Sequence, residues 1–124
     1  MRKVLLVDDD ADDKEMFELA LETLPVDTDL SYAANGQEAL ELITSPDFSD
    51  PDYIFLDLNM PKVGGVGFLS QLRELDMLTD VPVYIYTTSQ YGADIDRCVE
   101  MGGTLCTKSS SFKELCTMLS TTIV

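Results

Sequence analysis

Four short apolar runs in the sequence each end in polar or charged side chains. These side chains are Asp8 with Asp9, Asp57, Thr87 and Lys108. In open α/β sheets, ligands bind outside the carboxyl ends of the strands, so side chains at strand ends are placed to meet a ligand. Carboxylates suit a divalent cation, whereas a hydroxyl and an ammonium suit phosphoryl oxygens. The pattern therefore predicts one acidic site for a divalent metal and a phosphoryl group.

The carboxylates carry most of this prediction. Where a strand gives way to a loop, Asp8 and Asp9 can both turn toward the same end. Asp57 from a neighbouring strand would bring three carboxylates together, and like charges repel and raise one another's pKa. A hard cation such as Mg²⁺ relieves this repulsion. The alternative role, N-capping of the helix that follows, is expected of one of Asp10, Asp12 or Asp13.

Asp57 admits two roles. It is either a turn residue before 59–61 or a nucleophile that attacks phosphorus to form an acyl phosphate. In the second case, catalysis consists of positioning and of neutralising charge on the phosphoryl oxygens. Thr87 would donate a hydrogen bond to one oxygen, and Lys108 would offset the charge of another. Taken alone, Thr87 is more simply a β-favouring residue at a strand end.

The elements that must position these side chains alternate along the chain. Between the strands, apolar residues recur at helical spacing, as in 68–75 and 95–99. Five strands alternating with five helices predict one α/β domain over residues 1–124, with a doubly wound parallel sheet and helices on both faces. The second strand is the most polar, so we place it at an edge. The strands are expected at 3–7, 29–34, 52–57, 82–87 and 104–107.

Helix boundaries also have local signals. Pro25 terminates the first helix, and Asn35 with Gly36 opens the second. The glycines at 102–103 stop the fourth helix, and the serines at 109–111 supply an N-cap for the last.

Composition excludes several classes of function. A formal charge of −15 argues against unspecific binding to nucleic acid. No run approaches the ~18 apolar residues that a membrane span needs, and the N-terminal apolar run is too short for a signal peptide. We therefore expect a cytoplasmic protein. Three cysteines without CxxC spacing argue against disulfides or zinc. The sequence has no histidine, so any phosphohistidine must come from a partner.

Taken together, these residues resemble the receiver domain of two-component response regulators over the whole chain. The resemblance implies the flavodoxin-like fold, in which the five parallel strands have the order 2-1-3-4-5. It rests on the segments 4–9 and 56–61 and on Gly65, Thr87 and Lys108.

The resemblance also implies a function, that of a stand-alone response regulator. Asp57 would accept a phosphoryl group from a histidine kinase or histidine phosphotransfer protein, and Thr87 and Lys108 would bind the phosphoryl oxygens. Such a protein promotes its own phosphorylation and dephosphorylation and is a signalling phosphoacceptor rather than an enzyme. The Mg²⁺ ligands it implies are Asp9, Asp57, the backbone carbonyl of Asn59 and, mainly through water, Asp8.

Other positions follow from the same resemblance. Asn59 and Ser89 stand where the family tunes the lifetime of the phosphate. Leu105 replaces a common aromatic in the switch region, and Thr88 replaces a small residue and would narrow access to the site. A phosphoryl group adds about −1.5 to −2 charge, and it should repack the face formed by residues 91–122. That face would bind a downstream protein or a second copy of the chain in a homodimer.

Two departures concern the loops beside the site. Gly64 stands where the family usually has Asp, which loosens the loop before the third helix. Ser109 stands where the family usually has Pro after the lysine, often after a cis bond. Because a cis bond before Ser costs about 2.5–4 kcal/mol, we predict a trans bond between Lys108 and Ser109.

The sequence leaves three other hypotheses. A pseudo-receiver would keep the fold and bind partners without accepting phosphate. A Mg²⁺-dependent phosphatase of the haloacid dehalogenase type would use Asp8 and Asp10, whose spacing fits, but it lacks the expected Thr and room for a cap domain. A flavodoxin-like nucleotide binder is disfavoured because the first loop is acidic, where phosphate would need backbone donors.

Overall fold

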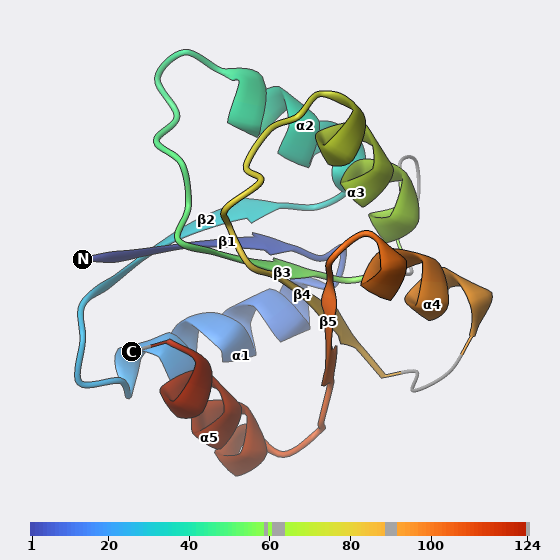
Figure 1. The fold of residues 1–124 in the computed structure, drawn as a ribbon. Coiled ribbons are helices and arrows are strands. Elements are labelled where there is room, and N and C mark those ends of the chain that lie inside the picture. The colour runs from blue at the N-terminus through green and yellow to red at the C-terminus, as the bar shows by residue number, and fades with distance from the viewer. Residues whose placement is uncertain (59, 61–63, 89–91, 124) are drawn as a thin grey trace.

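The fold is a single parallel sheet with helices on both faces (Figure 1). The structure is a computed structural model and describes residues 1–58, 60, 64–88 and 92–123. Its strands have the order β2-β1-β3-β4-β5, as the resemblance predicted. The strands are β1 (Arg2–Val7), β2 (Thr28–Ala33), β3 (Tyr53–Leu56), β4 (Val83–Thr87) and β5 (Thr104–Thr107). The helices are α1 (Ala11–Glu22), α2 (Gly36–Thr44), α3 (Gly65–Glu74), α4 (Ala93–Glu100) and α5 (Phe112–Thr122).

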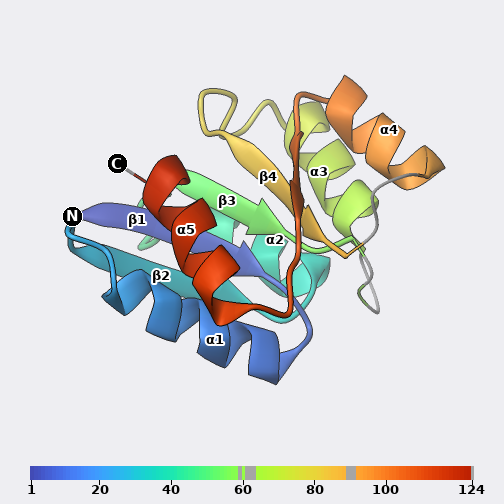
Figure 2. The same cartoon turned by 90° about the horizontal axis from the view of Figure 1, so that it is seen from below.

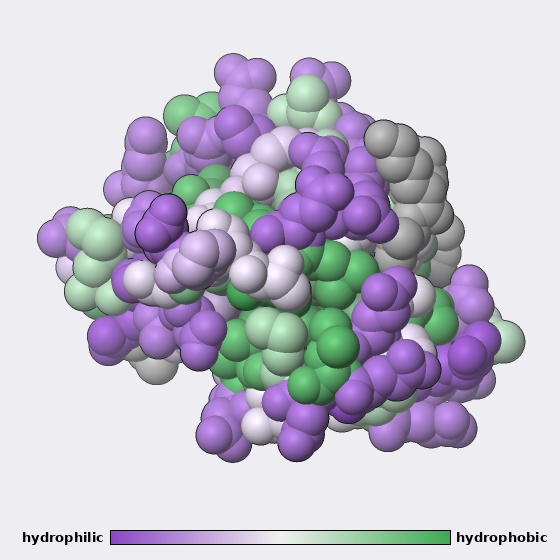
Figure 3. Space-filling view, turned by 90° about the horizontal axis from the view of Figure 1, so that it is seen from above, coloured by the Kyte–Doolittle hydropathy of each residue, from purple (hydrophilic) through white to green (hydrophobic). Residues whose placement is uncertain are grey.

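The helices form two layers. In Figure 1, α2 and α3 lie above the sheet, α4 lies beside it at the right, and α1 and α5 lie below it. Cys98 of α4 packs into the same cluster as α2 and α3, and Figure 2 views the α1 and α5 side. Viewed from above, the molecule shows mainly hydrophilic side chains around a central patch of apolar surface (Figure 3). Helices cover both faces of the sheet, so both sides of β1 and β3 are buried. These two strands are therefore apolar at consecutive positions.

Alternate residues of the central strands feed two separate hydrophobic clusters. Leu5 of β1 and Ile54 of β3 pack into the cluster beneath α2, α3 and α4. Leu6 and Phe55 point the opposite way, into the cluster with α1 and α5. There the rings of Phe55 and Phe17 pack edge to face, with their centroids 5.1 Å apart. The alternation follows from the two-residue period of a strand.

The sequence predicted the elements well and some of their apolar faces poorly. β2 lies at an edge of the sheet, as expected. Residues 34, 52, 57 and 82 fall outside the strands, and Asp57 is the first residue beyond β3. Leu75 and Val99 continue the apolar spacing of their helices but are about half exposed, 55% and 49%. Leu75 is the C-cap residue of α3 and has left the packed face.

The predicted caps are present. Asp10 caps α1, and its Oδ1 accepts hydrogen bonds from the backbone N–H groups of Asp12 and Asp13 at 2.9 and 3.3 Å. Asn35 caps α2 and Ser111 caps α5. The described residues contain no cis peptide bond, so the bond between Lys108 and Ser109 is trans, as predicted.

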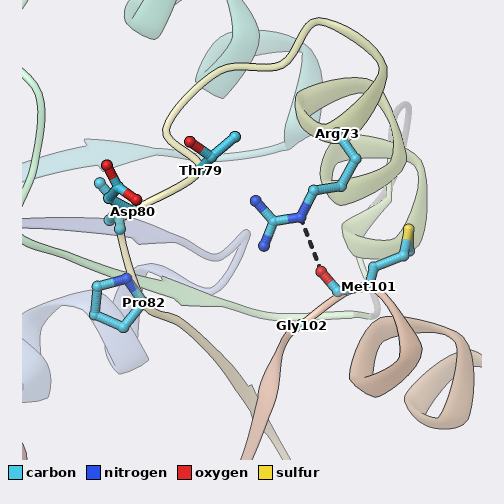
Figure 4. Close-up of a pocket in the computed structure, with 7 residues that line it drawn as sticks. Arg73, Thr79, Asp80, Pro82, Met101 and Gly102 are labelled. Atoms are coloured by element: carbon cyan, nitrogen blue, oxygen red, sulfur yellow. Dashed lines mark hydrogen bonds between the residues drawn. The ribbon is translucent and has the colours of Figure 1, made fainter.

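A cavity of about 440 Å³ opens at the amino ends of β4 and β5, on the edge of the sheet opposite the predicted site. Arg73 lines it, and its Nε donates a hydrogen bond to the carbonyl of Met101 at 2.8 Å (Figure 4). Met101 is the C-cap residue of α4, so this arginine satisfies a carbonyl at a helix end and ties α3 to α4.

Candidate functional site

The candidate site lies at the carboxyl edge of the sheet, where backbone hydrogen bonds continue past the strand ends. The N–H of Asp8 donates to the carbonyl of Ala33 at 3.0 Å, and the N–H of Asp57 donates to that of Val7 at 2.9 Å. The N–H of Lys108 donates to the carbonyl of Thr87 at 2.7 Å. These bonds fix where each side chain leaves the sheet, because the register of the strands extends one residue further.

Three carboxylates converge at this edge. Asp8, Asp9 and Asp57 each offer an oxygen, and these oxygens lie within 4.8 Å of one another. Asp8 is fully buried and Asp57 is 7% exposed, whereas Asp9 is exposed to solvent. The structure thus brings together the carboxylates that the sequence singled out, with the open side of the cluster at Asp9.

This donor set fits a hard divalent cation. All three groups offer oxygen, which Mg²⁺ prefers. The Oδ1 of Asp8 accepts a hydrogen bond from the N–H of Asp10 at 3.0 Å. Its buried Oδ2 lies 2.8 Å from Lys108 Nζ and forms an ion pair with that ammonium. Asn59, the fourth predicted ligand, lies outside the described residues.

Lys108 is surrounded by carboxylates. Its Nζ lies 2.8 Å from Asp8, 2.8 Å from Asp13 and 3.4 Å from Asp57, and 5.2 Å from the centre of the Tyr86 ring. Burial alone lowers the pKa of Lys108, but the bonds to Asp13 and Asp8 outweigh it and raise the pKa above its usual value. The ammonium therefore stays charged. It reaches Asp8 and Asp57 with Ser109, and not a proline, as the following residue.

The pKa of the buried Asp8 carboxyl is raised. Burial raises its pKa to about 6, although the hydrogen bond and charge of Lys108 and the backbone N–H of Asp10 act in the opposite direction. A buried carboxyl with a raised pKa is a common mark of a functional site.

We expect Asp8→Asn to stabilise the domain near neutral pH when no divalent cation is present. Because the pKa of Asp8 is higher in the folded state than its value of about 4 in an unfolded chain, the folded state binds the proton more tightly. Wild-type stability should therefore fall as pH rises through this window, by up to about 3 kcal/mol, and stay lower above it.

Chemical denaturation in a chelator measures this effect. Asp8→Asn should exceed the wild type near neutral pH, and the gap should close toward about pH 4, where both carry a neutral side chain. Mg²⁺ should stabilise the wild type more than the variant. A variant less stable than the wild type at both pH values would contradict the expectation.

The remaining predicted positions lie around this cluster. Thr87 ends β4 and is buried, and the next residue, Thr88, is exposed. Leu105 is half-buried on β5 and packs against the cluster beneath α2, α3 and α4. Ser89, one of the two predicted tuning residues, lies outside the described residues, as does Asn59.

Sequence reasoning missed three residues at the site. The Tyr32 hydroxyl of β2 donates a hydrogen bond to the backbone carbonyl of Asp8 at 2.6 Å. The sequence predicts Asp13 only as a possible helix cap, yet it accepts a hydrogen bond from Lys108 Nζ at 2.8 Å. Tyr86 places its ring beside the same ammonium. Of these three residues, only Asp13 has a signal in the sequence, because it lies in the first turn of the helix that follows the acidic loop.

The arrangement bears on the phosphatase hypothesis. That hypothesis pairs Asp8 with Asp10, but the carboxylate of Asp10 caps α1. Asp10 therefore does not pair with Asp8 in the site. The carboxylates that form ion pairs with Lys108 are those of Asp8, Asp13 and Asp57. A buried carboxylate beside two others and one fixed ammonium suits the uptake of a phosphoryl group with a divalent cation.

Comparison with known sequences identifies the family. The sequence model of the response regulator receiver domain matches residues 4–120. The chain belongs to the response regulator receiver family. Response regulator Rcp1 of Synechocystis sp. is 29% identical over 121 residues, which covers 94% of this chain and 82% of Rcp1. Sensor histidine kinase CheAY of Helicobacter pylori is 33% identical over 121 residues, or 97% of this chain and 15% of CheAY.

The chain spans only part of several relatives. It covers 15%, 27% and 38% of the lengths of CheAY, a protein-glutamate methylesterase of Myxococcus xanthus and the transcriptional regulatory protein YdfI of Bacillus subtilis. What these receiver-containing proteins share with the chain is thus one region of a longer polypeptide. Within the described part of the chain, no helix is both long and apolar enough to cross a bilayer.

Solved receiver structures agree with the fold. The phosphorylated cyanobacterial phytochrome response regulator RcpA superimposes with a TM-score of 0.86 at 28% identity, covering 98% of this chain and 90% of RcpA. The Mn²⁺-bound form of Rcp1 gives a TM-score of 0.84 at 28% identity, covering 98% and 91% of the two chains. The chemotaxis response regulator CheY4 of Vibrio cholerae gives 0.81 at 25% identity, covering 99% of each.

Proposed function

We propose that this receiver domain accepts a phosphoryl group on Asp57 in a Mg²⁺-dependent reaction. The observation that carries the proposal is the position of Asp57, buried at a strand end within 4.8 Å of the Asp8 and Asp9 oxygens and 3.4 Å from Lys108 Nζ. The donor is a phosphohistidine on a histidine kinase or phosphotransfer protein, because the chain has no histidine of its own.

The chemistry is a displacement at phosphorus. A bond forms between a carboxylate oxygen of Asp57 and phosphorus while the bond from phosphorus to the histidine nitrogen breaks. The departing imidazole keeps the electron pair and takes up a proton from solvent. Lys108 neutralises charge on a phosphoryl oxygen, and the Thr87 hydroxyl donates a hydrogen bond to another. Later attack by water on phosphorus breaks the bond to the Asp57 oxygen, releases inorganic phosphate and returns the carboxylate.

Asp9, Asp57 and the backbone carbonyl of Asn59 would hold Mg²⁺, with Asp8 acting mainly through water. The ion supplies charge neutralisation on the phosphoryl oxygens. The solved Rcp1 structure is a Mn²⁺-bound form and that of RcpA is phosphorylated, and both support this assignment for a related chain.

The phosphorylated domain passes its signal through the face formed by residues 91–122, of which the structure describes 92–122. Repacking there shifts the population between two arrangements, which changes binding of a downstream protein or of a second copy. Asn59 and Ser89 tune the lifetime of the phosphate, and Thr88 and Leu105 belong to the switch region. The cytoplasmic location and the single-domain organisation stay predictions.

Chemical trapping tests the proposal. The wild-type domain is incubated with phosphoramidate, a small donor with a phosphorus–nitrogen bond, with Mg²⁺ or with a chelator. Borohydride reduces an acyl phosphate, so peptide mass spectrometry should find the reduced side chain at position 57 only in the Mg²⁺ sample. A folded domain that takes no phosphate from this donor or from a phosphohistidine protein would favour the pseudo-receiver instead.

A further inference from the structure

Lys108 has closer partners than the proposed phosphoacceptor. Its Nζ lies 2.8 Å from both Asp8 and Asp13, but 3.4 Å from Asp57. The first two distances are typical of a charge-assisted hydrogen bond, and the third is longer than the usual range of about 2.7–2.9 Å. In this structure, the ammonium thus lies closer to Asp8 and Asp13, and it keeps only a long hydrogen bond to Asp57, at 3.4 Å.

Asp13 differs from Asp8 in its surroundings. It lies in the first turn of α1, held by the cap that Asp10 makes to its backbone N–H. Its side chain is 33% exposed, whereas that of Asp8 is fully buried. Separating Lys108 from Asp8 would strand a charge without solvent, which is costly, while Asp13 regains water when the ammonium leaves. The contact with Asp13 is therefore the one that gives way first.

We propose that Asp13 is a positioning residue that holds Lys108 off Asp57 in the unphosphorylated domain and competes with the phosphoryl group for the ammonium. The inference rests on the proposed function of Asp57. Phosphoryl oxygens carried by Asp57 draw Lys108 toward them, and the bond to Asp13 breaks as that contact forms. The cost of this exchange lowers the occupancy of the phosphorylated state and frees a charged side chain at the start of α1, the helix that packs against α5.

Removing the competitor should strengthen binding of a phosphoryl analogue. Beryllofluoride with Mg²⁺ is titrated into the wild type, Asp13→Asn and Asp12→Asn, and binding is followed by backbone amide NMR. Asp12 is the matched control because it is exposed in the same helical turn and its replacement removes the same charge. Asp13→Asn should bind the analogue about three- to tenfold more tightly than Asp12→Asn, the effect expected for one charged hydrogen bond weakened by solvent.

A second readout follows Lys108 directly. The ¹³Cε resonance of its side chain, recorded at neutral pH without any phosphoryl analogue, should shift from its wild-type position in Asp13→Asn and not in Asp12→Asn, because only the first variant loses the 2.8 Å ion pair with Lys108. In the wild type, adding beryllofluoride should move this resonance toward its position in Asp13→Asn.

The outcomes separate the two claims. Equal affinity of Asp13→Asn and Asp12→Asn for beryllofluoride would overturn the competition, even with the wild type binding normally. Failure of every folded variant to bind beryllofluoride or accept phosphate would overturn the proposed function and the competition with it. A Lys108 resonance shifted only in Asp13→Asn would in that case show a structural ion pair with Asp13 and nothing more.

Discussion

Phosphoryl uptake is expected to fall to background in Asp57→Asn. An amide has nearly the same shape as a carboxylate, but its oxygen lacks the negative charge that attacks phosphorus. The neighbouring carboxylates are poor substitutes, because Asp8 is fully buried beneath Lys108 and Asp10 caps α1. Radiolabel retained from phosphoramidate, compared between wild type and variant, measures the effect.

Two controls make this result specific. Asp12→Asn changes an exposed carboxylate of the same acidic segment and should keep wild-type uptake. Asp57→Asn should fold, since amide and carboxylate occupy similar space, and denaturation shows whether it does. Equal labelling of wild type and Asp57→Asn would refute the assignment of the phosphoacceptor.

Gly65→Ala should damage the site more than any change to a neighbouring loop glycine. A Cβ at position 65 would lie 2.6 Å from the backbone oxygen of Asp57, 2.8 Å from Cδ2 of Leu58 and 2.9 Å from its Cα. Two of these atoms belong to the backbone, so the loop carrying Asp57 must shift. We expect a loss of about 1–3 kcal/mol in unfolding free energy and on the order of tenfold slower phosphoryl uptake, because positioning carries much of the catalysis.

Gly64→Ala is the matched control. Its Cβ would approach the carbonyl oxygens of Leu58 and Met60 at only 3.5 and 3.7 Å, and its φ of −77° suits any residue. As the N-cap of α3 it should cost less than 1 kcal/mol when replaced by Ala. Similar losses of stability and uptake in the two variants would show that the loop tolerates neither methyl group and that the close approach at Gly65 is not decisive.

Much of the fold could be predicted because its signals are local. Apolar runs of strand length separated by helical spacing predict a doubly wound sheet, and polar residues just past those runs predict a shared edge. Asp8, Asp9, Asp57 and Lys108 converge for this reason. The strand order came from the resemblance to receivers rather than from periodicity.

The missed contacts depend on tertiary geometry. Asp13 meets Lys108 across 95 residues of sequence, and Tyr32 reaches the Asp8 carbonyl across 24. No spacing rule links such positions. Leu75 misled in the opposite direction, because its apolar spacing continues that of α3 although the helix has already ended. Periodicity predicts which face of a helix is buried, but not where that helix turns away from the core.

The alternation of β1 and β3 between the two hydrophobic clusters has a mechanical consequence. Leu5 and Ile54 anchor one layer, while Leu6 and Phe55, on the same strands, anchor the other. Neither layer can melt while the other stays packed, because both depend on the same backbone. The domain therefore unfolds as one cooperative unit, and strain introduced at the carboxyl edge of these strands reaches the helices on both sides of the sheet at once.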